Sequence, residues 1–121
     1  MSENKEYVTQ AIENGSIHIS EEVIVSIAAM AAMDVEGVCG LNEPTARLGK
    51  KVNNKGIRVV ISENDEISID CYLVVLYGCS VVDVAKAVQE SIGTMVESTT
   101  GCKVKSVNVS ISGIALSKEK K

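Results

Sequence analysis

Four cysteines and one histidine are the side chains best suited to chemistry in this chain of 121 residues. Cys39, Cys71, Cys79 and Cys102 are widely and irregularly spaced, and no two form the C-x-x-C pair of metal and redox sites. With His18 as the single histidine, a mixed Cys/His zinc site has few ligands available. We therefore expect reduced thiols that fill the core or the surface, and we predict no metal and no cofactor.

Catalysis has no other evident basis in the sequence. His18 lies in a short alternating segment without an evident carboxylate partner, which favours a solvent-facing strand residue over a general base. No paired carboxylates, nucleophile elbow or triad can be identified. The glycine and lysine at positions 49 and 50 lack the spacing of a phosphate-binding loop. The chain is predicted not to be an enzyme.

The charge and the aromatic content weigh against nucleic acid as the main ligand. The formal net charge is −4 and the sequence pI is about 5.0, which is the wrong sign for neutralising phosphates. Aromatic residues make up 2% of the chain, with three tyrosines and no phenylalanine or tryptophan. Stacking of single-stranded bases needs such rings. The core must therefore be aliphatic.

Positive charge is nevertheless concentrated in one segment. Residues 42–56 hold the single proline and four basic residues, Arg47, Lys50, Lys51 and Lys55, and Arg58 follows shortly after them. The composition predicts a long, flexible loop. A solvated loop is the simplest interpretation, and contact with anionic lipid head groups, RNA or an acidic partner surface remains an alternative.

The sequence gives no sign of secretion or of a membrane span. The first ten residues have no apolar core of a signal peptide. The apolar stretch at residues 23–33 is interrupted by Ser26 and is shorter than the roughly 18 residues needed to cross a bilayer. We expect a cytoplasmic protein, in which thiols are reduced by default.

Hydrophobic periodicity predicts one α+β domain over residues 15–116, between a flexible lead-in at 1–14, with a short ordered piece around 7–12, and a charged tail at 117–121. A short strand at 16–20, with Ile17 and Ile19 facing inward, is followed by a helix over 21–36 that Ser20 caps. Strands at 57–62 and 66–77 form a hairpin around a turn at 63–65.

A second predicted helix runs from its cap at Ser80 to Gly101, and a last strand covers 104–116. The core stripe of this helix comprises Val84, Ala85, Val88, Ile92, Met95, Val96 and Thr99. The order strand-helix-strand-strand-helix-strand favours a two-layer sandwich, with both helices on one face of a mainly antiparallel sheet.

The first predicted helix is apolar on nearly every side. Its core stripe consists of Ile24, Ile27, Ala28, Ala31 and Val35. The other faces are also apolar, with Val25, Ala29, Met30, Ala32 and Met33. Because one sheet cannot cover both sides of a helix, we predict an interaction surface formed by Val25, Ala29, Met30 and Met33.

Residue parity predicts which side chains occupy the sheet face away from the helices. They are His18, Arg58, Val60, Ser68, Asp70, Tyr72, Val74, Leu76, Ser106, Asn108 and Ser110. Most are small or polar, as expected for a solvated face. Tyr72, Val74 and Leu76 form an apolar run there, which indicates a second docking surface.

Four motifs cover residues 15–113: residues 15–24 leading into 28–29 and 35–38, residues 70–78, residues 84–101, and residues 104–113. In these motifs and their order, the chain resembles the alkaline shock protein family of Gram-positive bacteria, also called the envelope stress response family. The motifs concern the fold and carry no catalytic residues.

The resemblance implies an abundant, non-enzymatic cytoplasmic protein. Some members are held near the inner face of the cell membrane by a membrane-anchored partner and are connected with envelope stress, and several self-associate. The leading prediction is a non-catalytic interaction and self-assembly module, a homo-oligomer recruited by an anchor protein. The alternatives are a regulator of a fatty-acid synthesis enzyme and a small RNA-binding domain that uses the basic residues at 47–58.

Overall fold

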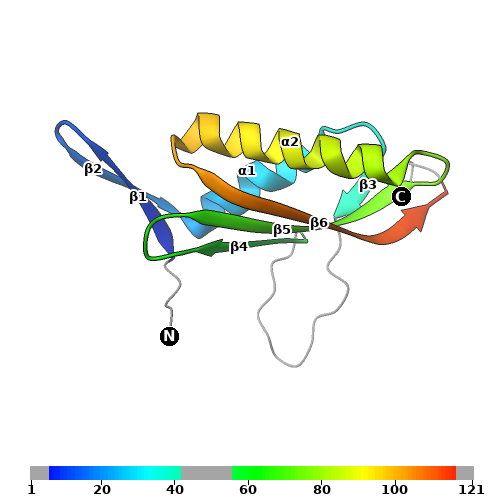
Figure 1. Ribbon diagram of the computed structural model, residues 1–121, viewed down its shortest axis with the longest axis horizontal. Helices are drawn as coiled ribbons and strands as arrows, with labels where there is room; N and C mark the ends of the chain where they lie inside the picture. Colours follow the sequence, from blue (N-terminus) through cyan, green and yellow to red (C-terminus); the bar gives the residue numbers. More distant parts are fainter. Residues whose placement is uncertain (1–5, 42–55, 117–121) are drawn as a thin grey trace, which may run out of the picture.

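The computed structural model describes residues 6–41 and 56–116. Within them the elements are, in chain order, β1 (Tyr7–Ile12), β2 (Gly15–Ser20), α1 (Glu21–Met33), β3 (Val38–Leu41), β4 (Ile57–Ile61), β5 (Ile67–Leu76), α2 (Val81–Thr100) and β6 (Val104–Ala115). Figure 1 shows α1 and α2 together on one side of a sheet, with a hairpin extending from one end. The predicted α+β sandwich is confirmed.

Strand β5 is the centre of the main sheet. β6 pairs with it in parallel along its whole length, from Ile67↔Val104 to Leu76↔Ala115. β3 and β4 therefore share the other edge, where both run antiparallel to β5. The strand pairs are mainly antiparallel, as predicted, and the parallel β5–β6 pair arises because the crossover helix α2 returns the chain to the end where β5 begins.

The helices bury one face of this sheet. Alternate residues of β5 are buried throughout, namely Ile67, Ile69, Cys71, Leu73 and Val75. α1 packs over β3 and β4, α2 packs over β6, and the two helices contact each other. This arrangement makes one aliphatic core that also includes Ile24, Ile57 and Ile92.

Serine caps begin both helices as predicted. The side chain of Ser20 accepts a hydrogen bond from the backbone N–H of Val23, and that of Ser80 accepts one from Asp83. α2 ends at Gly101, whose φ of 75° is left-handed. α1 ends at Met33 rather than near residue 36, because the chain turns toward β3, a strand that was not predicted.

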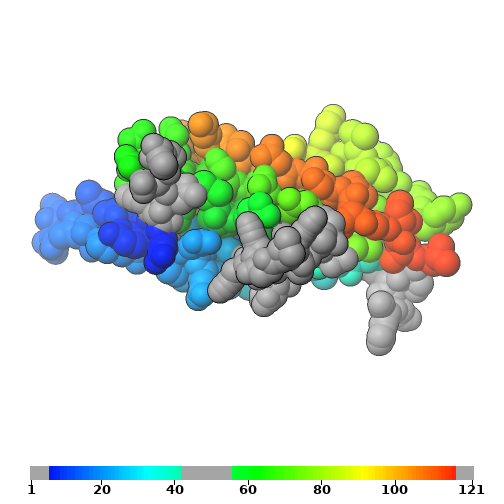
Figure 2. Space-filling model, turned by 90° about the horizontal axis from the view of Figure 1, so that it is seen from below, coloured from blue at the N-terminus to red at the C-terminus, as the bar shows by residue number. Residues whose placement is uncertain are grey.

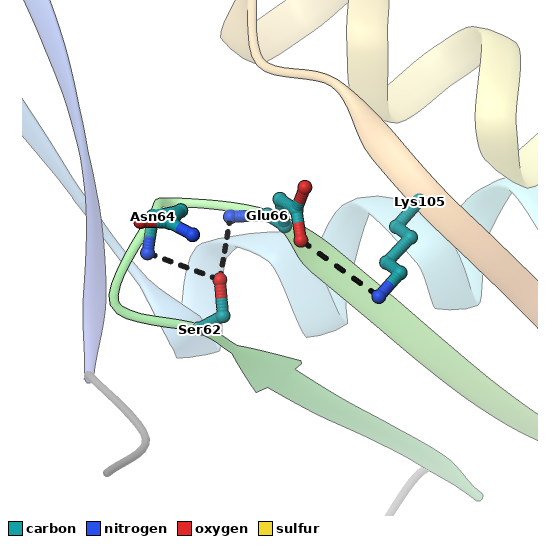
Figure 3. Close-up of polar contacts among 4 residues, drawn as sticks. All are labelled: Ser62, Asn64, Glu66 and Lys105. Atoms are coloured by element: carbon teal, nitrogen blue, oxygen red, sulfur yellow. Dashed lines mark hydrogen bonds and ion pairs between the residues drawn. The ribbon is translucent and has the colours of Figure 1, made fainter. Parts of the chain in front are cut away.

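The β4–β5 hairpin also has the predicted turn. The hydroxyl of Ser62 accepts hydrogen bonds from the backbone N–H groups of Asn64 (3.1 Å) and Glu66 (3.2 Å), as Figure 3 shows. Asp65 has a φ of 63°, a conformation that aspartate tolerates in turns. The side chain of Ser62 therefore stabilises the turn between β4 and β5.

The amino-terminal region contains the short ordered piece expected around residues 7–12. This piece is the strand β1 (Tyr7–Ile12). β1 pairs with β2 in a separate two-stranded sheet, which projects from the body in Figures 1 and 2. Ile17 is 47% exposed rather than inward-facing, whereas Val8 is buried and Ile19 is half-buried. The hairpin is oriented by its contacts with the body, which alternation alone does not reveal.

The core stripe of α2 also differs in part. Val84, Val88, Ile92 and Val96 are buried as predicted. Met95 and Thr99 are exposed, and Thr100 is buried instead. The hydroxyl of Thr100 donates to the carbonyl of Val96 (2.7 Å) and accepts from the backbone N–H of Cys102 (3.1 Å), so its polar group is satisfied inside the protein.

Candidate interaction surfaces

An apolar groove lies beside the exposed face of α1. We call it the α1 groove: it has a volume of about 630 Å³ and is lined by Ser26, Ala29, Met30, Met33, Asp34, Gly40 and Leu41. Met30 is 68% exposed and Met33 is 46% exposed. Positions 26, 29, 30 and 33 follow helical spacing, so a single face of α1 builds one wall. β3 supplies Gly40 and Leu41 on the other side.

Two residues of the predicted surface on α1 are buried in the chain itself. Val25 and Ala29 are each 7% exposed, and Ala32 is fully buried. α2 packs against α1, and the hydroxyl of Ser91 donates to the carbonyl of Ala31 (2.9 Å). Val25 is thus buried within the chain, whereas Ala29, although 7% exposed, still lines the α1 groove.

The predicted patch on the open sheet face is less exposed than the α1 groove. Tyr72, Val74 and Leu76 alternate with the buried residues of β5 and are half-buried. Val74 packs close to Gly113 of β6, where an added Cβ would lie 3.5 Å from a Val74 methyl. The parity prediction is confirmed for these residues, and their binding role stays a prediction.

Most of the other residues on that face, onto which Figure 2 looks, are polar, with Val60 of β4 an exposed apolar exception. Asn108 donates from its Nδ2 to Oδ1 of Asp70 (3.1 Å) across the β5–β6 pair. Arg58 lies on β4 in register with Asp70 and is exposed. Arg47, Lys50, Lys51 and Lys55, the other predicted anionic contacts, lie outside the described residues. An anionic contact therefore stays a prediction.

The cysteines differ in their surroundings. Cys71 and Cys102 are buried, whereas Cys39 and Cys79 are half-buried. Burial raises the pKa of the Cys71 thiol to about 12, which keeps it protonated. The Cys79 thiol donates to the carbonyl of Leu76 (2.9 Å). Across the described ranges 6–41 and 56–116, no three His, Cys, Asp or Glu side chains are grouped to hold a metal ion.

His18 does not lie on the open face of the main sheet, as parity had suggested. It belongs to the β1–β2 hairpin, where its ring stacks on Tyr7 with centroids 4.6 Å apart and an interplanar angle of 11°. Next to this hairpin, burial raises the pKa of Glu21, and the nearby carboxylates of Glu6 and Glu22 add to the rise. These groups form a local surface cluster at the start of α1.

A second groove was missed by the sequence analysis. It lies between α2 and β6, has a volume of about 420 Å³, and is lined by Gln89, Glu90, Gly93, Thr94, Glu97, Val104, Lys105, Ser106 and Val107. We call it the β6 groove. Its α2 residues lie off the predicted core stripe of that helix, where helical spacing alone predicts exposure to solvent. No local pattern shows that a strand edge lies beside that face.

The described helices include none that is both long enough and apolar enough to span a membrane.

Comparison with known proteins identifies relatives over most of the chain. The chain is 37% identical over 105 residues to the uncharacterized protein YqhY of Bacillus subtilis (strain 168), covering 83% of this chain and 77% of that protein. It is 36% identical over 107 residues to the uncharacterized protein YloU of the same strain, covering 83% and 88%. Among solved structures it is similar to a variant of the MamM CTD, with 21% identity, a TM-score of 0.44, and coverage of 76% and 93%. That likeness is too distant to inform fold or function.

The family assignment comes from a match that spans nearly all of the described fold. The alkaline shock protein family, described as having a cell envelope-related function, matches residues 9–116. The resemblance drawn from the four motifs is thereby confirmed. The chain belongs to the alkaline shock protein family, a family with a cell envelope-related function.

Proposed function

We propose that this chain is a non-catalytic protein-interaction and self-assembly module that acts at the cell envelope. The observation that carries the proposal is the α1 groove, in which Met30 and Met33 expose large apolar side chains beside Leu41. Exposed apolar patches of this kind mark interaction sites on proteins in water. The family's cell envelope-related function supports the cellular setting.

The first occupant that we propose for the α1 groove is a second copy of the chain. A helix face with methionines one turn apart can pack against its own copy about a two-fold axis, since each copy offers both a ridge and a groove. Methionine is unbranched and adapts to an irregular partner surface. The resulting dimer would hide Met30 and Met33 from water.

A mutation pair tests self-assembly. Sedimentation velocity of the wild-type chain should show a species larger than the monomer at micromolar concentration. Met30→Glu with Met33→Glu should shift that species to the monomer, because paired carboxylates cannot be buried without a large desolvation cost. Met95→Glu is the matched control, since Met95 is also 46% exposed but lies on α2. A wild-type monomer, or equal effects of both substitutions, would contradict self-assembly through α1.

The second part of the proposal is recruitment to the cell membrane by a membrane-anchored protein. Its support is the envelope-related function of the family. A tagged chain expressed in its own bacterium should be found with the membrane fraction. Chemical crosslinking should join it to an integral membrane protein whose deletion releases it. Recovery entirely in the supernatant, with no such crosslink, would refute recruitment.

A further inference from the structure

The outer edge of β6 is open in the part of the chain that the structure describes. β6 pairs with β5 on one side, and none of the other described strands pairs with it. Figure 2 shows β6 (orange) running along one margin of the sheet. An open edge presents backbone N–H and C=O groups to which an extended chain can add.

Pairing parity identifies the backbone groups at that edge. The backbone N–H of Tyr72 donates to the carbonyl of Gly56, the residue before β4. The backbone groups of Tyr72, and of every second residue of β5 counted from it, therefore point toward β4. The intervening residues, such as Ile69 and Cys71, must point toward β6. In the parallel register, the backbone N–H and C=O groups of Ser106, Asn108 and Ser110 then form the hydrogen bonds with β5. Those of Val107, Val109 and Ile111 point outward.

Helix α2 already occupies part of this edge with side chains. Glu97 accepts from the backbone N–H of Val104 (2.9 Å), and Gln89 donates from its Nε2 to the carbonyl of Val107 (3.1 Å). Both contacts are exposed to solvent. These two side chains bond to backbone groups that a neighbouring strand would otherwise bond. Either side chain can be displaced with little loss of free energy, because water can replace its hydrogen bond.

Side chains along the same edge are incompletely buried. Val104, Val107, Val109 and Ile111 pack against the core but remain half-exposed. An added strand would cover these β-branched residues and extend the sheet. Gly93 in the wall of the β6 groove leaves open space, since no atom lies within 4 Å of where its Cβ would be. A backbone can therefore approach α2 closely at this point.

The charges around the β6 groove indicate what charge a bound peptide segment should carry. Glu90 and Glu97 line its α2 side. Lys105, the basic residue of the lining, forms an ion pair with Glu66 (3.8 Å), shown in Figure 3. A basic segment is complementary to the two carboxylates. A second copy paired edge to edge would instead bring two sets of these carboxylates to one junction, which like-charge repulsion disfavours.

We propose that the β6 groove binds an extended segment of a partner protein in which lysine or arginine occupies every second position, so that these side chains share the face toward α2. The segment adds to the sheet along Val104–Ile111, where it displaces Glu97 from the Val104 N–H and Gln89 from the Val107 carbonyl. Its basic side chains lie against Glu90 and Glu97. This inference rests on the proposed function as an interaction module and assigns that module a second site.

A short capped peptide of alternating valine and lysine is the probe, and amide hydrogen exchange followed by NMR is the readout. In the free chain the N–H groups of Val109 and Ile111 should exchange faster than those of Asn108 and Ser110. Saturating peptide should slow exchange at Val109 and Ile111 by at least about tenfold, equivalent to about 1.4 kcal/mol. The same peptide with N-methylated alternate residues cannot form the ladder and should give no protection.

Two pairs of variants separate backbone pairing from charge. Val109→Pro removes an outward N–H, which an edge strand tolerates, and should abolish binding, whereas Val109→Ala keeps the N–H and should bind. Glu90→Gln with Glu97→Gln keeps hydrogen-bonding groups but should weaken binding about tenfold and flatten its salt dependence. Glu22→Gln with Glu36→Gln, which removes the same charge from residues on and just after α1, is the control and should bind as wild type.

Three outcomes would overturn the proposal: no protection at Val109 and Ile111, equal binding of the N-methylated peptide, or concentration-dependent protection of these groups without peptide. The last would assign the edge to a second copy. Failure here is distinct from failure of the proposed function. If Met30→Glu with Met33→Glu still dissociates the assembly while the peptide gives no protection, the module stands and only the β6 site is rejected.

Discussion

At the scale of single residues, Gly37 joins α1 to β3 under two constraints at once. Its φ is 99°, in the region that side chains with a Cβ rarely adopt. A Cβ at this position would also lie 2.8 Å from a methyl group of Val84 on α2. Gly37 therefore lets the chain turn from α1 into β3 while in close contact with Val84 of α2. Gly40, three positions later, has neither constraint.

Gly37→Ala should lower the free energy of unfolding by about 2 kcal/mol or more, because backbone strain and overpacking add. Urea denaturation monitored by circular dichroism measures the effect. Gly40→Ala is the matched control and should change stability by less than about 1 kcal/mol, since no atom lies within 4 Å of the added Cβ. Equal losses in the two variants would contradict this explanation.

The buried thiol of Cys71 predicts how stability depends on pH. Its pKa is raised from 9.0 to about 12 in the folded chain, so the unfolded chain releases this proton first as the pH rises. The contribution to stability is complete below pH 9 and is lost between pH 9 and 12. Urea unfolding across this range should show a steeper loss in the wild type than in Cys71→Ala. Parallel curves would show that Cys71 is not responsible.

At the scale of elements, the β1–β2 hairpin is part of the folded body despite its separate sheet. Gln10 donates from its Nε2 to the carbonyl of Gly101 (2.9 Å), next to the end of α2. The backbone N–H of Thr9 donates to Asp65 in the β4–β5 turn (3.3 Å), and Val8 is fully buried. The hairpin is thus positioned by the ends of two other elements, both distant in sequence.

Gln10→Ala should loosen the hairpin without unfolding the sheet. Losing a hydrogen bond worth about 1 kcal/mol should speed amide exchange in β1 and β2 roughly fivefold. Exchange in β5 should be unchanged, which hydrogen-exchange mass spectrometry can resolve by segment. Glu13→Ala, at the exposed tip, is the control and should leave both regions as in the wild type. A uniform increase throughout the chain would instead indicate global destabilisation.

At the scale of the whole molecule, the two grooves lie on opposite edges of the main sheet. The α1 groove borders β3, which pairs with one edge of β5, and the β6 groove lies beyond the other edge. They share no lining residue. A second copy at the α1 groove therefore leaves the β6 groove free for a different protein. Such an arrangement would let one module assemble and bind a partner at once.

This separation predicts that the two activities can be lost independently. Met30→Glu with Met33→Glu should give a monomer that still protects Val109 and Ile111 on adding the valine–lysine peptide. Glu90→Gln with Glu97→Gln should sediment as the wild type while binding the peptide about tenfold more weakly. Sedimentation velocity and peptide titration on the same samples test both statements. Loss of both activities in either variant would mean that the surfaces are coupled.

Much of the fold could be predicted because its signals are local. Ser20 and Ser80 cap the helices, Gly101 ends α2, and the turn at Ser62 joins two alternating strands. β1 was expected only as a short ordered piece of unspecified structure, because its sequence carries no strong alternation and Val8 is its one buried residue. The parallel direction of β6 could not be read, since either direction gives the same alternation along the strand.

The sequence by itself determined the family, the helix boundaries near their caps, and which faces of β4 and β5 are buried, because each follows from short-range spacing. Only the tertiary structure decided which apolar side chains stay exposed. Burial within the chain leaves Val25 and Ala29 each 7% exposed, whereas Met30 and Met33 stay open to solvent. The β6 groove likewise exists only because α2 lies along a strand edge, and exposure depends on residues that are distant in the chain.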